Sequence, residues 1–148
     1  MLKIYYSYII FGLIILSGCS SPNNCPVLEY NSIEKLTRVN GDPYTGRCIT
    51  YKDDYKRSVQ QYINGIDSGR WVFYYPNGEI ETIGRFKNGK RVGKWKYYYP
   101  NGKIMQISQY SGTGERSGDW IEYDTIGNIL GKVKYWFIYK NYYKQLEN

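Results

Sequence analysis

Few residues of this chain have side chains suited to catalysis, because its 148 residues include no histidine. Histidine is the commonest general base and metal ligand, so its absence removes the usual acid–base and metal sites. Glu79 and Glu81 are two residues apart and could form a carboxylate pair for acid–base catalysis. Both follow a tight turn on an expected surface strand, where a solvated role is favoured. We therefore predict no catalytic residues, no metal site, no cofactor and no enzymatic activity.

One cysteine thiol is suited to covalent modification. Cys19 follows small residues and a short apolar run, Ile9 to Leu16, which is far below the ~20 residues that a membrane-spanning helix needs. The sequence from Leu16 to Cys19, Leu-Ser-Gly-Cys, resembles a bacterial lipobox. This resemblance implies removal of residues 1–18 and acylation of Cys19. Acyl chains would hold the chain at a membrane, since each buried methylene contributes ~0.8 kcal/mol. The alternative is an ordinary cleaved signal peptide followed by a chance cysteine.

The same resemblance predicts a place in the cell. We expect the chain in the cell envelope, lipid-anchored to a membrane through Cys19. Ser20 follows the lipidated cysteine, and by resemblance to the sorting rules of cells with two membranes it permits an outer-membrane destination.

Cys25 and Cys48 remain once Cys19 is lipidated. In an exported protein two such cysteines can pair, and a disulfide closing a loop of this length could add ~3 kcal/mol of stability. Two free thiols, with Cys48 filling a small core position, are the alternative.

Aromatic residues form the best candidate for a binding surface. If the segments around Trp71 and Trp95 are strands, alternation places six aromatic side chains on one face. These residues are Trp71, Phe73, Tyr75, Trp95, Tyr97 and Tyr99. Flat rings can stack on sugars or anchor a protein interface, but the same rings could instead form the core of a thin sheet.

A sequence repeat predicts the elements that position these side chains. Trp71, Trp95 and Trp120 recur at intervals of 24 and 25 residues, each followed by tyrosine three residues later and glycine seven residues later. Cys48 takes the tryptophan position in a shorter first unit. A period of this size indicates an array of supersecondary units that bury their apolar faces against one another.

Local signals within each unit predict a β-hairpin. Tyr-Tyr-Pro-Asn-Gly and Lys-Asn-Gly-Lys are turn sequences, and the chain has 19 tyrosines but no alanine. We predict an all-β fold: an elongated antiparallel meander of tandem β-hairpin repeats in an open, single-layer, twisted sheet of about nine strands. The predicted division is a signal peptide at 1–18, a lipidated tether at 19–35, the repeat domain at 36–139 and a tail at 140–148.

The net charge of +7 has several interpretations. A basic surface could contact nucleic acid, anionic lipid or an acidic glycan, or it could keep a tyrosine-rich sheet soluble and protect its edges. Export argues against nucleic acid. The charge alone therefore identifies no partner.

The repeats over roughly 36–135 resemble the bacterial variant of the MORN repeat, in the form called YwqK-type antitoxin proteins. The matching sequences are Gly-x-Trp-x-x-Tyr-Tyr-Pro-Asn-Gly from Gly69 and the corresponding residues from Gly93, with Pro43-Tyr44-Thr45-Gly46 as the opening of the array. The resemblance implies hairpin repeats used for protein or lipid contact, without catalytic residues.

Three functions follow as expectations. The first is a membrane-anchored, non-enzymatic interaction module that contacts a protein or a membrane surface. The second is an antitoxin or immunity-like protein that neutralises a partner by binding. The third is a glycan- or peptidoglycan-binding module that uses the aromatic face.

Overall fold

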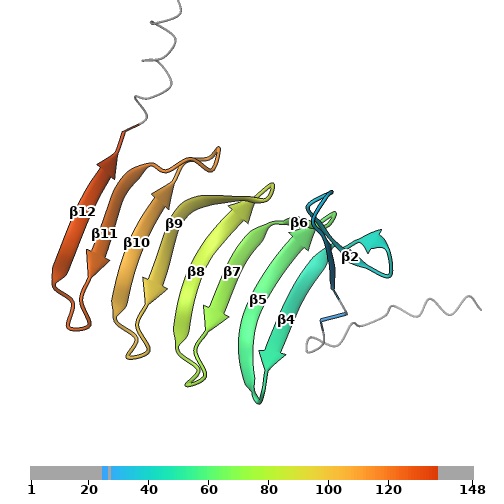
Figure 1. Ribbon diagram of the computed structural model, residues 1–148, viewed down its shortest axis with the longest axis horizontal. Coiled ribbons are helices and arrows are strands. Elements are labelled where there is room, and N and C mark those ends of the chain that lie inside the picture. The colour runs from blue at the N-terminus through green and yellow to red at the C-terminus, as the bar shows by residue number, and fades with distance from the viewer. Residues whose placement is uncertain (1–24, 27, 137–148) are drawn as a thin grey trace, which may run out of the picture.

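The computed structural model describes residues 25, 26 and 28–136. Over these residues the chain is all-β, with twelve strands and no helix, which confirms the predicted fold class (Figure 1). The predicted signal peptide, Cys19 and the predicted C-terminal tail lie outside the described residues. The repeat domain was predicted to extend to residue 139, and its last strand ends at Tyr135.

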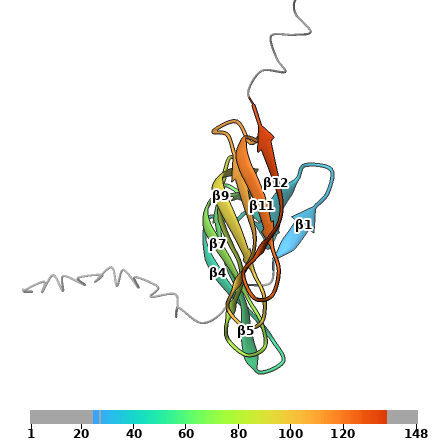
Figure 2. The same ribbon diagram turned by 90° about the vertical axis from the view of Figure 1, so that its left-hand side faces the viewer.

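Nine strands form one antiparallel sheet that follows chain order, except that the short β6 and β7 both pair with β5, so the predicted meander is confirmed. Figure 2 shows its twist from the side. The strands are β4 (Gly46–Lys52), β5 (Tyr55–Ile63), β6 (Ile66–Asp67), β7 (Gly69–Tyr74), β8 (Ile80–Lys87), β9 (Lys90–Tyr98), β10 (Ile104–Tyr110), β11 (Gly118–Tyr123) and β12 (Ile129–Tyr135).

A second, three-stranded sheet precedes the first hairpin. It consists of β1 (Glu29–Asn31), β2 (Leu36–Val39) and β3 (Asp42–Pro43). The predicted tether at 19–35 therefore contains a strand, β1, and β2, which lies within the predicted repeat domain, pairs in this small sheet instead. The side chain of Asn31 closes the β1–β2 turn by accepting hydrogen bonds from the backbone N–H groups of Ile33 and Glu34.

The turns at one end of the large sheet are short because Asn-Gly pairs adopt left-handed backbone angles. Asn64 and Asn88 have φ of 50° and 51°, and the glycines after them have φ of 75° and 73°. Positive φ at both central residues is what a tight two-residue hairpin requires. The equivalent turn between β10 and β11 is longer and is closed by the backbone of Ser111, whose N–H donates to the carbonyl of Glu115.

The turns at the other end bond to one another across repeats. The side-chain amide of Asn77 donates to the carbonyl of Pro100 at 2.8 Å, and that of Asn101 donates to the carbonyl of Thr125 at 3.2 Å. The Tyr75 hydroxyl likewise donates to the Tyr98 carbonyl at 2.7 Å. The last three hairpins are thereby held in register with one another at this end.

Every hairpin has a β-bulge just after this turn. The register shifts by one residue on the returning strand, which leaves one extra residue in each repeat. These residues are Arg57, Glu81, Met105 and Leu130. Because a bulge breaks the strict alternation of side chains, the two strands of a hairpin cannot be assigned to faces by one continuous count.

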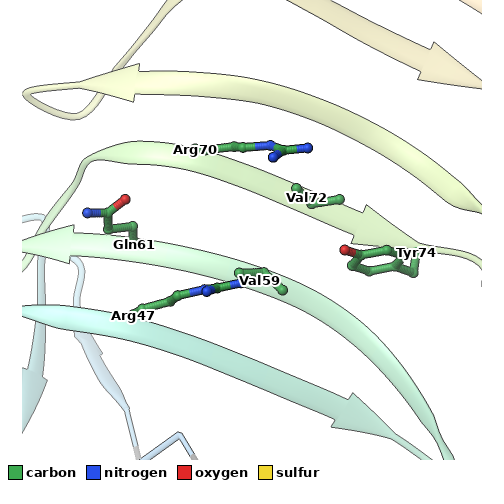
Figure 3. Close-up of a pocket in the computed structure, with 6 residues that line it drawn as sticks. All are labelled: Arg47, Val59, Gln61, Arg70, Val72 and Tyr74. Atoms are coloured by element: carbon green, nitrogen blue, oxygen red, sulfur yellow. The ribbon is translucent and has the colours of Figure 1, made fainter. Parts of the chain in front are cut away.

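The register of the strands then defines two faces. The Trp face contains Trp71 and Trp95, and the opposite face contains Arg70 and Val72. Figure 3 shows the opposite face over β4, β5 and β7, where side chains from the three strands lie together.

The core lies on the Trp face, where each indole bonds back to the preceding strand. The Nε1–H groups of Trp71, Trp95 and Trp120 donate to the carbonyls of Gln61, Arg85 and Gln109, at 3.0, 3.2 and 3.0 Å. The aromatic residues of the returning strands fill the spaces between the indoles. Phe86 lies between two of them, with ring centroids 4.7 Å from Trp71 and 5.0 Å from Trp95.

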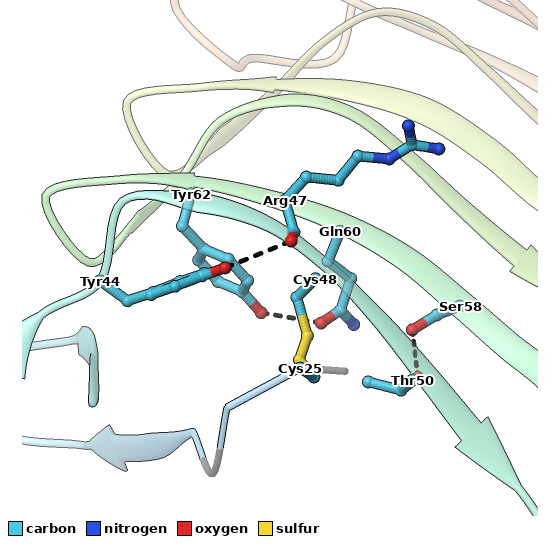
Figure 4. Close-up of a disulfide and its surroundings, with 8 residues drawn as sticks. All are labelled: Cys25, Tyr44, Arg47, Cys48, Thr50, Ser58, Gln60 and Tyr62. Carbon is cyan, nitrogen blue, oxygen red and sulfur yellow. Dashed lines mark hydrogen bonds between the residues drawn. A yellow bond between two sulfur atoms is a disulfide. The ribbon is translucent and has the colours of Figure 1, made fainter. Parts of the chain in front are cut away.

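A disulfide closes the first end of this core. Cys48 is fully buried in the position that tryptophan has in later repeats, and it is bonded to Cys25, with Cα atoms 4.8 Å apart (Figure 4). Tyr62 packs in the same cluster, and Leu28 and Tyr44 contact its edge. The N-terminal segment thus supplies the volume that an indole supplies elsewhere.

A first prediction concerns the residue under Trp95. Any Cβ on Gly84 would overlap the Trp95 indole. We expect Gly84→Ala to destabilise the protein by about 1–3 kcal/mol, as overpacking of a filled core does. Urea denaturation followed by tryptophan fluorescence measures this. Gly131→Ala is the matched control, since a Cβ there meets no atom within 4 Å. Equal midpoints for the two variants would contradict the packing.

A second prediction concerns the disulfide. Reducing the oxidised protein should lower its unfolding free energy by roughly 3 kcal/mol, because the bond restricts the unfolded chain. The change is measured by denaturation with and without dithiothreitol. The double variant Cys25→Ser/Cys48→Ala should have low stability under both conditions. A wild-type midpoint that does not respond to reductant would show that the bond contributes nothing.

Candidate binding surfaces

The six aromatic residues predicted as a binding face divide into two groups. Trp71 and Trp95 are 8% and 1% exposed, so they belong to the core. Phe73, Tyr75, Tyr97 and Tyr99 are partly buried. For the two tryptophans, the alternative is therefore correct: they form the core of the sheet. Neither indole is open for stacking on a ligand.

The tyrosine hydroxyls of this face are also used inside the array. The Tyr99 hydroxyl donates to the Tyr123 carbonyl at 2.8 Å, as Tyr75 does to Tyr98. Arg91 lies over the Trp95 ring, 4.6 Å from its centroid, and donates to the Tyr97 hydroxyl. Burial raises the pKa of the Tyr97 phenol above its ordinary value of 10.0.

The first core cluster holds one more neutral phenol. Burial raises the pKa of Tyr62 to about 12, and nearby Asp67 acts in the same direction. The Tyr62 hydroxyl donates to the side-chain oxygen of Gln60 at 2.8 Å, as Figure 4 shows. Both features fit a structural role in the cap of the array.

The carboxylates that could have formed an acid–base pair are separated by the bulge. Glu81 is the bulge residue and forms an ion pair with Arg57, while Glu79 is exposed in the preceding turn. Within residues 25, 26 and 28–136, no group of histidine, cysteine or acidic residues has the geometry of a metal site. The same residues contain no helix long and apolar enough to cross a bilayer.

The opposite face of the sheet, here called the basic face, has three rows of side chains running across the strands. The row nearest the Asn-Gly turns, here called the basic row, follows from the pairs Arg47–Gln61, Arg70–Arg85, Lys94–Gln109 and Asp119–Lys134. The central row is mainly aliphatic and comprises Ile49, Val59, Val72, Ile83, Lys96, Ile107, Ile121 and Lys132. The third row contains Tyr51, Tyr74, Tyr98 and Tyr123.

Two hollows lie next to each other on the basic face, and Arg70 lines both. The first, of about 300 Å³, is lined by Arg47, Val59, Gln61, Arg70, Val72 and Tyr74 (Figure 3). The second, of about 290 Å³, is lined by Arg70, Ile83, Gly84, Arg85, Lys94, Lys96 and Tyr98. Each hollow therefore combines an aliphatic floor, cationic side chains and a tyrosine.

Sequence reasoning missed this face as a site. Alternation along the first strand of each hairpin places Arg70, Lys94 and Lys96 opposite the tryptophans, and this signal was available. Arg85 lies on a returning strand beyond the bulge, where alternation could not be continued from the first strand. The second hollow, which Arg85 lines, depends on that assignment.

Comparisons with known proteins bear on the central repeats. The family described as MORN repeat variant matches residues 68–88 and 91–111. No curated protein matches the chain. A solved structure, the "Crystal structure of GtfA/B complex bound to UDP and GlcNAc", is similar at 13% identity and a TM-score of 0.35, over 80% of this chain and 30% of that one. A likeness this low carries no argument about function.

The two matched segments coincide with the hairpins β7–β8 and β9–β10, which contain Trp71 and Trp95. Sequence match and hairpin geometry thus agree, and these two central hairpins are repeats of the MORN variant type.

Proposed function

We propose that this chain is a membrane-anchored lipoprotein whose repeat domain acts as a non-enzymatic interaction module in the cell envelope. MORN repeats are generally interaction modules, and the match to residues 68–88 and 91–111 supports that role here. The lipobox-like sequence ending at Cys19 supports the anchor.

The observation that supports the interaction role best is the difference in burial between the two faces. The Trp face buries Trp71 and Trp95 within the array, whereas four cations of the basic face are exposed: Arg47, Arg70, Arg85 and Lys94. An exposed surface with hollows and several charges is suited to binding. Neutralisation of a partner by binding, which the YwqK-type resemblance implies, would be one use of such a surface.

The anchor is tested by changing the residue proposed to carry the lipid. We expect Cys19→Ser to leave the signal peptide uncleaved by the lipoprotein peptidase and to abolish incorporation of radiolabelled palmitate. Mobility on gels and fractionation into membrane and soluble pools provide the measurements. Ser20→Ala is the control and should be processed like the wild type. Equal size and equal labelling of Cys19→Ser and wild type would refute the anchor.

The interaction role is tested by photo-crosslinking in cells. A photoreactive phenylalanine analogue at Gln61, which is exposed between Arg47 and Arg70, should give a slower-migrating adduct of the anchored protein. The same analogue at Asp54, in the exposed turn of the first hairpin, is the matched control and should give none. Absence of adducts from Gln61 and from three further positions on the basic face would overturn the proposed role.

A further inference from the structure

We propose that the basic face binds a linear acidic glycan, laid across the strands with its carboxylates on the basic row and its sugar rings in the two hollows. This inference rests on the proposed function, because a chain in the cell envelope meets such polymers. It names the ligand class that the interaction module would take.

The first argument is the run of cations across neighbouring strands of the basic face. Cations lie on three consecutive strands of the basic face, with Arg70 on β7, Arg85 on β8 and Lys94 on β9, and all three line the second hollow. Neighbouring strands are ~4.8 Å apart, which sets the interval between the register partners Arg70 and Arg85, while Lys94 follows beyond a register shift at which Arg85 pairs with Val92. That interval is similar to the length of one sugar ring in an extended polymer.

The second argument is a pairing that the fold alone does not favour. Arg70 and Arg85 are direct register partners on adjacent strands, and like charges in that position destabilise a sheet. The ion pairs among the described residues join Arg38 to Glu34, Arg57 to Glu81 and Lys132 to Asp119, and none reaches this arginine pair. An anion between the two guanidinium groups would remove the repulsion.

The third argument is the shape and lining of the hollows. Their volumes, about 300 and 290 Å³, fall at the lower end of the range for small-ligand pockets. Val59 and Val72 form an apolar floor in one hollow, and Tyr74 forms part of its wall. Sugar rings present apolar C–H faces that pack on aromatic and aliphatic side chains, while their hydroxyls remain in water.

These features favour a glycan over two other anionic partners. An acidic peptide supplies carboxylates but no rings for the hollows. A bilayer supplies an array of charges but presents a broad surface that contacts the rims of the hollows rather than their floors. Rings and charges in one extended chain satisfy both parts of the surface.

The experiment measures binding of the full mature chain in detergent to polygalacturonate, a linear polymer of acidic sugars. Methyl-esterified polygalacturonate keeps the rings without the charge, and polyglutamate keeps the charge without the rings. We expect binding to polygalacturonate alone among the three, and we expect that binding to weaken steeply as salt is raised.

Two variants test the site itself. Arg70→Gln/Arg85→Gln should weaken polygalacturonate binding about tenfold or more, as loss of central charged contacts does. Its urea midpoint should equal or exceed that of the wild type, because a like-charge pair is removed. Gln61→Glu, which keeps the side-chain shape, should also weaken binding by placing a carboxylate between Arg47 and Arg70.

The matched control removes the same number of charges elsewhere. Lys52 and Lys103 are exposed near the opposite ends of the strands, and Lys52→Gln/Lys103→Gln should bind within about twofold of the wild type. Equal losses in this control and in the arginine variant would overturn the proposal, as would binding of polyglutamate or of anionic lipid vesicles as tight as that of polygalacturonate. Failure of glycan binding with normal lipidation and Gln61 adducts would leave the proposed function intact.

Discussion

The structure depends on the packing and bonding of each tryptophan against the strand that precedes it. An indole that donates to a carbonyl 10 or 11 residues earlier joins two neighbouring hairpins that have no second layer to hold them. Trp95 can approach the sheet this closely because Gly84 has no side chain. A single-layer sheet buries little apolar surface, so these repeated contacts between hairpins take the place of a central core.

The two ends of the array differ in how the tryptophan position is filled and covered. At the first hairpin the tryptophan position is Cys48, and the disulfide to Cys25 with the surrounding aromatic residues fills the space. At the other end, Trp120 still contacts Tyr110 and Tyr135, but Leu130 and Val133 of the last strand are 68% and 55% exposed. The two ends are therefore unlike: one is covered by the N-terminal segment, and the other presents apolar side chains on β12.

Much of the fold could be predicted from the spacing of the repeats, because the repeat period and the turn residues are local properties of the sequence. The tryptophan interval, the Asn-Gly turns and the alternation in Trp71-Val72-Phe73 were sufficient for the meander. The folded hairpin at Glu29–Val39 was missed because β1 has three residues and its turn depends on the Asn31 side chain rather than on a Gly-containing pair. The basic face was missed because the bulge at Glu81 interrupts the alternation that would have placed Arg85 beside Arg70.

The unequal turns at the two ends of the strands affect how such an array can change. The Pro-Asn-Gly side is tied from repeat to repeat by Asn77 and Asn101, whereas the Ser111–Glu115 loop on the other side accommodates an added residue without disturbing the strands that it joins. Insertions should therefore be tolerated on the Asn-Gly side and selected against on the Pro-Asn-Gly side. Variation in loop length would then accumulate next to the basic row. It would change the surface available for binding while the strands and their tryptophan contacts stay the same.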